Sequence, residues 1–199
     1  KLNGMVEYNS TTQQYLISGS GVNMWFASDQ ANFLWKKMKG NFIVTAHVEF
    51  VGDGKELHRK FGWMVRNSLD SISTHLNISV HGDGLTSIQY RKVAGENTEE
   101  VKMKANLPNI IQIERKGQDY IVSVAKYGEP FVSDTFRAEF INDDAFVGLF
   151  VCSHNANNME QAKFSNVRIV VPAGDDLVPY KQYLGSHLEI MDIETGNRT

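Results

Sequence analysis

Short runs of alternating apolar and polar residues follow one another along the chain, and Gly, Asn or Asp residues end most of them. The clearest run extends from Phe42 to Phe50 and stops at Gly52-Asp53-Gly54. Successive side chains of a β-strand point to opposite faces, so this pattern indicates a half-buried antiparallel strand followed by a turn. Helical spacing is almost absent, and we therefore predict an all-β chain.

The same alternation returns at other places between turn signals. The further predicted strands are Gly4–Tyr8, Gln14–Ser18, Asn23–Phe26, Phe61–Arg66, His75–Val80, Thr86–Val93, Ile110–Arg115, Tyr120–Tyr127, Ala145–Cys152 and Phe164–Val171. About ten or more strands at a spacing of roughly 8 to 12 residues are typical of sandwiches and barrels. Only residues 28–38 compete as a helix, because Ser28 or Asp29 can cap a turn, and we interpret this segment as a short turn or irregular link.

Composition excludes several classes of function. The chain has 199 residues, of which 42% are hydrophobic, enough for one sizeable domain or one domain with a small appendage. A formal net charge of -3 leaves no basic surface for nucleic acid. The single cysteine, Cys152, excludes an intramolecular disulfide framework and a multi-cysteine metal site. No run approaches the roughly 20 apolar residues of a transmembrane helix, and the N-terminus lacks an apolar signal core, so the signal of an exported protein would already have been removed.

A boundary is predicted where Pro172 and Pro179 bracket small and acidic residues. We therefore expect one domain over 1–172, followed by a linker and a lone C-terminal strand over 173–199. That strand is the alternating run 187–196, which ends in a Thr-Gly turn. A single strand is not a domain, so it must pack on the sandwich, pair with another chain, or begin something longer.

Several segments resemble a known family. They are Gly21-Val-Asn-Met-Trp-Phe26, Phe33-Leu-Trp-Lys-Lys-Met-Lys-Gly-Asn-Phe42, His58-Arg-Lys-Phe-Gly-Trp-Met-Val-Arg66, His81-Gly-Asp-Gly-Leu-Thr86 and Val147-Gly-Leu-Phe-Val-Cys-Ser-His154. Together they resemble the concanavalin A-like lectin/glucanase sandwich of Bacteroidetes TolB-like proteins, which precedes a β-propeller. The resemblance implies a jelly-roll sandwich of two antiparallel sheets over 1–172, a first propeller strand at 188–196, and export to the periplasm or cell surface.

In such a sandwich, extended sugars commonly bind the concave face of one sheet, through aromatic rings and planar polar groups. Arg66, the pair Gln89 and Arg91, and the series His75, Asn77, Ser79 and His81 would share that face. Alternatively, the polar side chains of 75–79 are only the solvent-facing side of a strand. Trp63 alternates with Phe61 and Val65 and is expected in the core, while Gly62 would leave room for a ligand or a neighbouring ring.

Three further positions complete the candidate ligand site. His81 and Asp83 flank a glycine at a strand end, where loop residues can converge on a ligand or a calcium ion, although Asp-Gly is also a common hairpin turn. His154 follows an apolar strand and is a candidate for the rim of the site. Core packing is the expected role of Trp25 and Trp35, but an exposed Trp25 would extend the aromatic platform.

No complete catalytic set is evident. Glu189 lies on the opposite face of its strand from Asp192 and Glu194, so these residues do not form a retaining glycosidase pair. Cys152 and His154 share a strand face but lack a third, orienting group. The leading hypothesis is therefore a non-catalytic carbohydrate-binding module. The alternatives are a carbohydrate-active enzyme using Asp83, Glu49 or His81, and an interaction domain for a β-propeller or another subunit.

Overall fold

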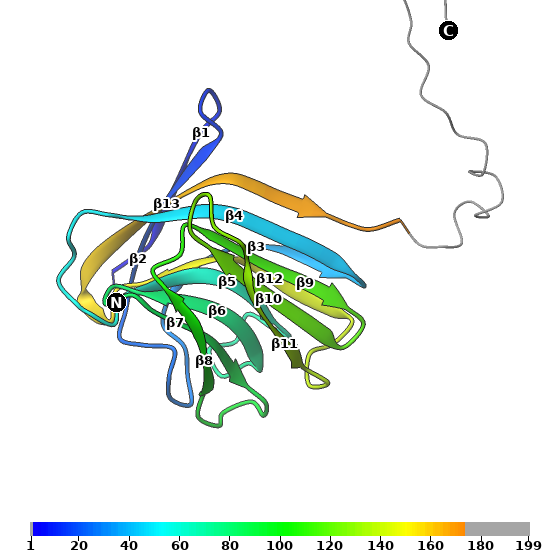
Figure 1. The fold of residues 1–199 in the computed structure, drawn as a ribbon. Coiled ribbons are helices and arrows are strands. Elements are labelled where there is room, and N and C mark those ends of the chain that lie inside the picture. Colours follow the sequence, from blue (N-terminus) through cyan, green and yellow to red (C-terminus); the bar gives the residue numbers. More distant parts are fainter. Residues whose placement is uncertain (1, 174–199) are drawn as a thin grey trace, which may run out of the picture.

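The computed structural model describes residues 2–173, which form two antiparallel β-sheets packed face to face (Figure 1). The seven-stranded sheet contains, in spatial order, β1 (Met5–Asn9), β2 (Gln14–Gly21), β13 (Asn155–Val170), β4 (Phe42–Val51), β9 (Ile110–Lys116), β10 (Asp119–Ala125) and β11 (Val132–Arg137). The six-stranded sheet contains β3 (Asn32–Lys39), β12 (Asp144–Cys152), β5 (Lys60–Arg66), β6 (His75–His81), β7 (Leu85–Arg91) and β8 (Glu99–Asn106). Within these residues, no helix is long and apolar enough to cross a membrane.

Alternation along the strands builds the core between the sheets. Val44 and Ala46 on β4 are fully buried. They belong to the same core cluster as Trp63 on β5 and Ile78 on β6, which come from the opposite sheet. The expectation that Trp63 lies in the core is therefore confirmed. Gly62, on the opposite face of β5, leaves no space for a ligand, because an added Cβ would lie 1.6 Å from the Ile78 carbonyl oxygen and 3.1 Å from the Phe150 ring.

The outer face of the six-stranded sheet is also buried, because the connection between β2 and β3, residues 22–31, lies across it. Met24 packs against Met64, Phe150 and Cys152 in a second apolar cluster. Thr98 beside β8 donates hydrogen bonds to the carbonyl oxygens of Met24 and Trp25. The alternative interpretation of 75–79, as the solvent-facing side of a strand, is wrong, since every residue of β6 is buried.

Three predictions of secondary structure are corrected. Asn32–Lys39, expected as an irregular link, is the edge strand β3. Residues 23–26, expected as a strand, belong to the covering connection. Strands β8 and β11 were not predicted. Trp35 is 46% exposed on β3, where it contacts Phe146 edge to face, so the packing role expected between the sheets is wrong for this ring. The predicted boundary beyond residue 173 and the strand at 187–196 lie outside the described residues.

Candidate functional site

A pocket of about 240 Å³ opens at one end of the outer face of the six-stranded sheet. We call it the histidine pocket, and its lining residues are Asn23, Trp25, His58, Lys60, His81, Leu85, Gln89, Glu100 and His154. The strand register brings much of it together, because Lys60 lies opposite Cys152 on β12 and opposite His81 on β6. The covering connection adds Asn23 and Trp25, so the pocket combines sheet residues with a loop.

The side-chain amide of Asn23 links both sides of the pocket. Its Oδ1 accepts hydrogen bonds from Lys60 Nζ at 3.0 Å and from the Met24 backbone N–H at 2.8 Å. Two donors on the oxygen fix the orientation of the amide, so Nδ2 faces His154 Nε2 at 3.1 Å. In this arrangement the His154 nitrogen accepts, and the neutral ring carries its proton on Nδ1.

The ring of His81 is held in a similar way. Its Nδ1 lies 2.9 Å from the Leu85 carbonyl oxygen, an acceptor only, so Nδ1 carries the proton. Its Nε2 lies 3.4 Å from Gln89 Nε2, and Gln89 Oε1 in turn accepts from Ser79 Oγ at 3.2 Å. This network fixes the imidazole and the amide as planar polar groups at the end of the sheet.

Burial and a neighbouring cation favour the neutral form of two imidazoles, those of the buried His81 and the partly buried His154. Burial lowers the pKa of His81 to about 4, and the positive charge of Lys60 acts in the same direction. Burial, Lys60 and His58 likewise lower the pKa of His154. At the rim, His58 Nδ1 lies 3.9 Å from Asp83 Oδ2. At neutral pH the pocket therefore presents the neutral imidazoles of His81 and His154 beside a lysine.

Protonation of His81 predicts a loss of stability in mild acid. The folded-state pKa is about 4 and the unfolded value is 6.5, so the unfolded chain binds more protons between these values, and the free energy of unfolding falls as pH decreases from 6.5 to 4. The expected contribution is about 3 kcal/mol. Urea denaturation measures the free energy of unfolding at pH 7 and at pH 4. The decrease between the two pH values should be smaller in His81→Gln than in the wild type by about 3 kcal/mol. Equal losses in the two proteins would contradict the assignment.

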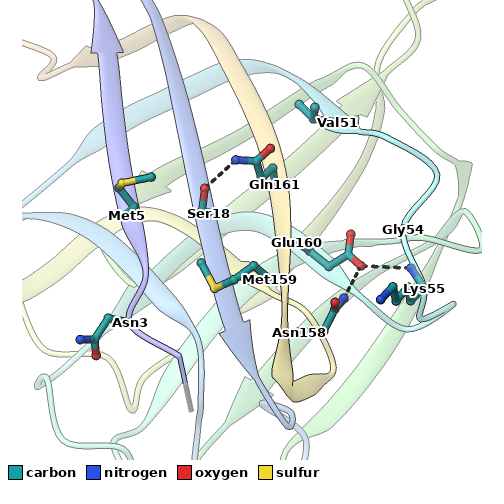
Figure 2. Close-up of a pocket in the computed structure, with 10 residues that line it drawn as sticks. All are labelled: Asn3, Met5, Ser18, Val51, Gly54, Lys55, Asn158, Met159, Glu160 and Gln161. Atoms are coloured by element: carbon teal, nitrogen blue, oxygen red, sulfur yellow. Dashed lines mark hydrogen bonds between the residues drawn. The ribbon is translucent and has the colours of Figure 1, made fainter.

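A second, larger cavity of about 520 Å³ lies beside strands β1, β2 and β13 (Figure 2). We call it the Glu160 cavity. Its carboxylate is already satisfied: Glu160 accepts from Arg59 Nη1 at 2.7 Å, from the Lys55 backbone N–H at 3.0 Å and from Asn158 Nδ2 at 3.0 Å. Gln161 Nε2 similarly donates to Ser18 Oγ at 2.9 Å. The charge of Glu160 is already paired and no aromatic ring among residues 2–173 lines this cavity, so the Glu160 cavity is a weaker candidate than the histidine pocket, which has Trp25.

Two residues predicted to bind ligand lie at the far end of the sheet from the histidine pocket. Arg91 Nη2 contacts Asp29 Oδ1 at 2.6 Å, and Arg66 Nη2 contacts Asp29 Oδ2 at 3.4 Å. His75 Nδ1 lies 3.3 Å from the same Oδ2. Burial raises the pKa of Asp29, but the contacts with His75 and Arg91 outweigh it, and the pKa falls below its usual 3.8. Both arginines in this Asp29 cluster therefore attach the covering connection to the sheet.

The other five predicted ligand residues lie at or beside the histidine pocket. Trp25, His81, Gln89 and His154 line it. Asp83 sits at the rim in the β6–β7 hairpin turn, where Oδ1 accepts from the Leu85 N–H at 3.0 Å. Among residues 2–173, no group of three or more His, Cys, Asp and Glu side chains is placed to hold a metal ion.

Five residues that line the histidine pocket were not predicted as site residues: Asn23, His58, Lys60, Leu85 and Glu100. The position of Lys60 could have been deduced from spacing. It is separated by even numbers of residues from Gly62, Met64 and Arg66 on β5, so it shares their outward face. Glu100 lies on β8, a strand that was not predicted. His58 and Asn23 lie on connections, whose positions alternation does not specify.

No family model matches the sequence, and no curated protein matches it either. Among solved structures, the chain is similar to a functionally unknown protein from Saccharomyces cerevisiae, with a TM-score of 0.65, 14% identity, and coverage of 85% of this chain and 93% of that one. It is similar to the carbohydrate-binding module CBM66 from Bacillus subtilis, with a TM-score of 0.57, 13% identity, and coverage of 85% and 92%. It is also similar to a GH43 protein from Bacillus licheniformis, with a TM-score of 0.59, 10% identity, and coverage of 86% of this chain and 38% of that one.

These likenesses concern the fold, since all three identities are low. They agree with the sandwich of two antiparallel sheets seen in this chain. None of the three is described as TolB-like, and that part of the resemblance stays a prediction. Residues 2–173 form a concanavalin A-like jelly-roll β-sandwich.

Proposed function

We propose that this chain is a non-catalytic carbohydrate-binding module whose ligand enters the histidine pocket. The observation that carries the proposal is the combination of a partly buried indole with fixed planar polar groups in one small concavity. Trp25 offers an aromatic face for sugar C–H groups, and Asn23 and Gln89 offer amides for hydroxyls. The likeness in fold to a carbohydrate-binding module supports the proposal.

Binding is favoured over hydrolysis because the pocket lacks a carboxylate pair. Glycosidases generally use two carboxyl groups, about 5 to 5.5 Å apart in retaining enzymes and about 6.5 to 9.5 Å apart in inverting enzymes. Within the described part of the chain, one carboxylate, that of Glu100, lines the histidine pocket. Asp83, the acid–base candidate at the rim, is not among the lining residues and accepts a hydrogen bond from the Leu85 N–H within its own hairpin turn. Glu49, an acid–base candidate from the sequence, forms an ion pair with Lys163 on the other sheet.

The wider setting of the module is also part of the proposal. We infer from the sequence resemblance that the protein is exported to a bacterial periplasm or cell surface and that the sandwich precedes a TolB-type propeller. A docking role towards such a propeller is the alternative within the same setting. The segment that would begin the propeller, 188–196, lies outside the described residues.

A glycan-array screen of the wild-type chain, with and without calcium, tests the proposed function. We expect binding to at least one saccharide class, and we expect Trp25→Ala to weaken it by about tenfold or more through the lost ring contact. Trp35→Ala is the matched control, because Trp35 is an exposed indole outside the histidine pocket. Binding that survives Trp25→Ala, or the absence of any binding, would overturn the proposal. Calcium-dependent binding would add an ion to the site.

A further inference from the structure

Lys60 is a buried cation without a buried counter-ion. Its residue is 2% exposed, and it lies at the start of β5 among the residues of the histidine pocket. Its described hydrogen bond is the one that Nζ donates to Asn23 Oδ1 at 3.0 Å. An ammonium group has three N–H donors, so two of them have no hydrogen-bond partner among residues 2–173.

Every other buried cation in the described chain contacts a carboxylate. Arg59 pairs with Glu160 at 2.7 Å, and Arg66 and Arg91 pair with Asp29. Arg115 lies 3.7 Å from Asp143. Lys60 alone among the buried lysines and arginines of residues 2–173 has no carboxylate within 4.0 Å. Because burial without a partner disfavours the charged form, it also lowers the pKa of this amine.

The immediate neighbours of Lys60 leave room for a negative charge. The buried imidazole of His81 is neutral at neutral pH and does not neutralise the cation. Burial lowers the pKa of Lys60 and outweighs Cys152, opposite it on β12, and Glu100, the carboxylate of the lining, which both raise that pKa. Glu100 lies 4.0 Å from the exposed Lys102 amine and forms no ion pair with Lys60 within 4.0 Å. The neutral tautomer of His154 keeps a proton on Nδ1, which adds a donor to the lining. A lysine and a donor imidazole are the groups that bind a carboxylate.

We propose that the histidine pocket binds an acidic saccharide, whose carboxylate pairs with the ammonium group of Lys60. The inference rests on the proposed function and names the chemical class of its ligand. The carboxylate supplies the counter-charge that the fold does not provide, so the ion pair and its hydrogen bonds offset the cost of burying both groups. Neutral sugars of the same shape leave Lys60 unpaired and bind more weakly.

Calorimetric titration of the full chain with galacturonate, and with galactose and methyl galacturonate ester as uncharged probes, tests this inference. We expect galacturonate to bind the wild type at least about tenfold more tightly than either neutral probe, and the preference to shrink as salt concentration rises. Lys60→Met removes the charge but keeps most of the stem, and it should weaken galacturonate binding by about ten- to hundredfold. Loss of the hydrogen bond from Lys60 to Asn23 should also weaken binding of the neutral probes, but by less than about tenfold, so the preference for galacturonate should disappear.

Glu100→Gln is the matched control, because it removes a negative charge from the same lining. It should maintain or strengthen galacturonate binding, and circular dichroism confirms that each variant is folded. Equal binding of galacturonate and the neutral probes, unaffected by Lys60→Met, would overturn the acidic-saccharide inference and leave the proposed function intact. No binding of any probe at millimolar concentration, together with an empty glycan array, would overturn both.

Discussion

Replacing Asp29 with asparagine is expected to lower the free energy of unfolding by about 3–5 kcal/mol. The aspartate side chain is 3% exposed and contacts Arg66 and Arg91, whose side chains are 7% and 0% exposed. Asparagine has nearly the same shape but no charge, so the substitution leaves two guanidinium groups buried without a counter-ion. Chemical denaturation monitored by circular dichroism measures the loss.

The effect of Asp29→Asn should extend beyond the ion pairs. Asp29 lies four residues after Trp25 on the covering connection. Its backbone N–H donates a hydrogen bond to the Ser71 carbonyl oxygen at 2.8 Å. Weaker attachment of this connection is therefore expected to weaken saccharide binding as well. Asp144→Asn is the control, because the Lys37–Asp144 pair is more than half exposed and should change stability by no more than about 0.5 kcal/mol. Similar losses in the two variants would refute a special role for the buried cluster.

Alternation in the sequence predicted the strands that have one face in the core. Phe42, Val44 and Ala46 on β4 and Phe61, Trp63 and Val65 on β5 are all buried between the sheets. Period-two spacing identifies such strands because burial on one face selects apolar residues at every second position. The two edge strands β3 and β8 carry exposed charged residues, among them Lys36, Lys37 and Glu99, and this masked their alternation.

The outer face of the six-stranded sheet shows where pattern reasoning fails. Polar residues at every second position of β6, such as Asn77 and Ser79, normally indicate contact with water. Here the covering connection buries them, and its docking depends on Met24 and Asp29, which contact residues far away in the sequence. A loop that covers a sheet leaves no periodic signal of its own, so its position could not be deduced from spacing.

The candidate site was predicted only in part, because part of it depends on the covering connection, whose position the spacing does not indicate. The alternation of side chains along the strands correctly predicted that four residues share one face of the sheet. In the structure His81 and Gln89 lie at one end of that face, and Arg66 and Arg91 lie at the other. Asp29 and Arg66 line a separate cavity of about 330 Å³ at one end, and His81 and Gln89 line the histidine pocket at the other. Lys60 escaped notice because a lysine at the start of a strand normally extends into water.

Removing Arg59 is also expected to lower the free energy of unfolding by about 3–5 kcal/mol, because it leaves a buried carboxylate, that of Glu160, without its counter-ion. The guanidinium lies 2.7 Å from Glu160 and 4.2 Å above the Phe50 ring, between the chain at Gly54 and Gly82. In Arg59→Met the carboxylate keeps its hydrogen bonds to the Lys55 N–H and Asn158 but loses its counter-ion. Urea denaturation of this variant measures the cost of leaving the buried carboxylate of Glu160, which lines the Glu160 cavity (Figure 2), without its counter-ion.

The double variant Arg59→Met/Glu160→Gln separates charge from packing. Glutamine at 160 removes the unpaired charge and retains an oxygen for the Lys55 N–H, so the double variant should recover at least about 2 kcal/mol relative to Arg59→Met alone. A double variant as unstable as the sum of the two single ones would instead assign the loss to the Arg59 stem against Phe50. Saccharide binding in the histidine pocket should survive in the double variant, because neither residue lines that pocket. Binding lost with the fold intact would place the ligand in the Glu160 cavity instead.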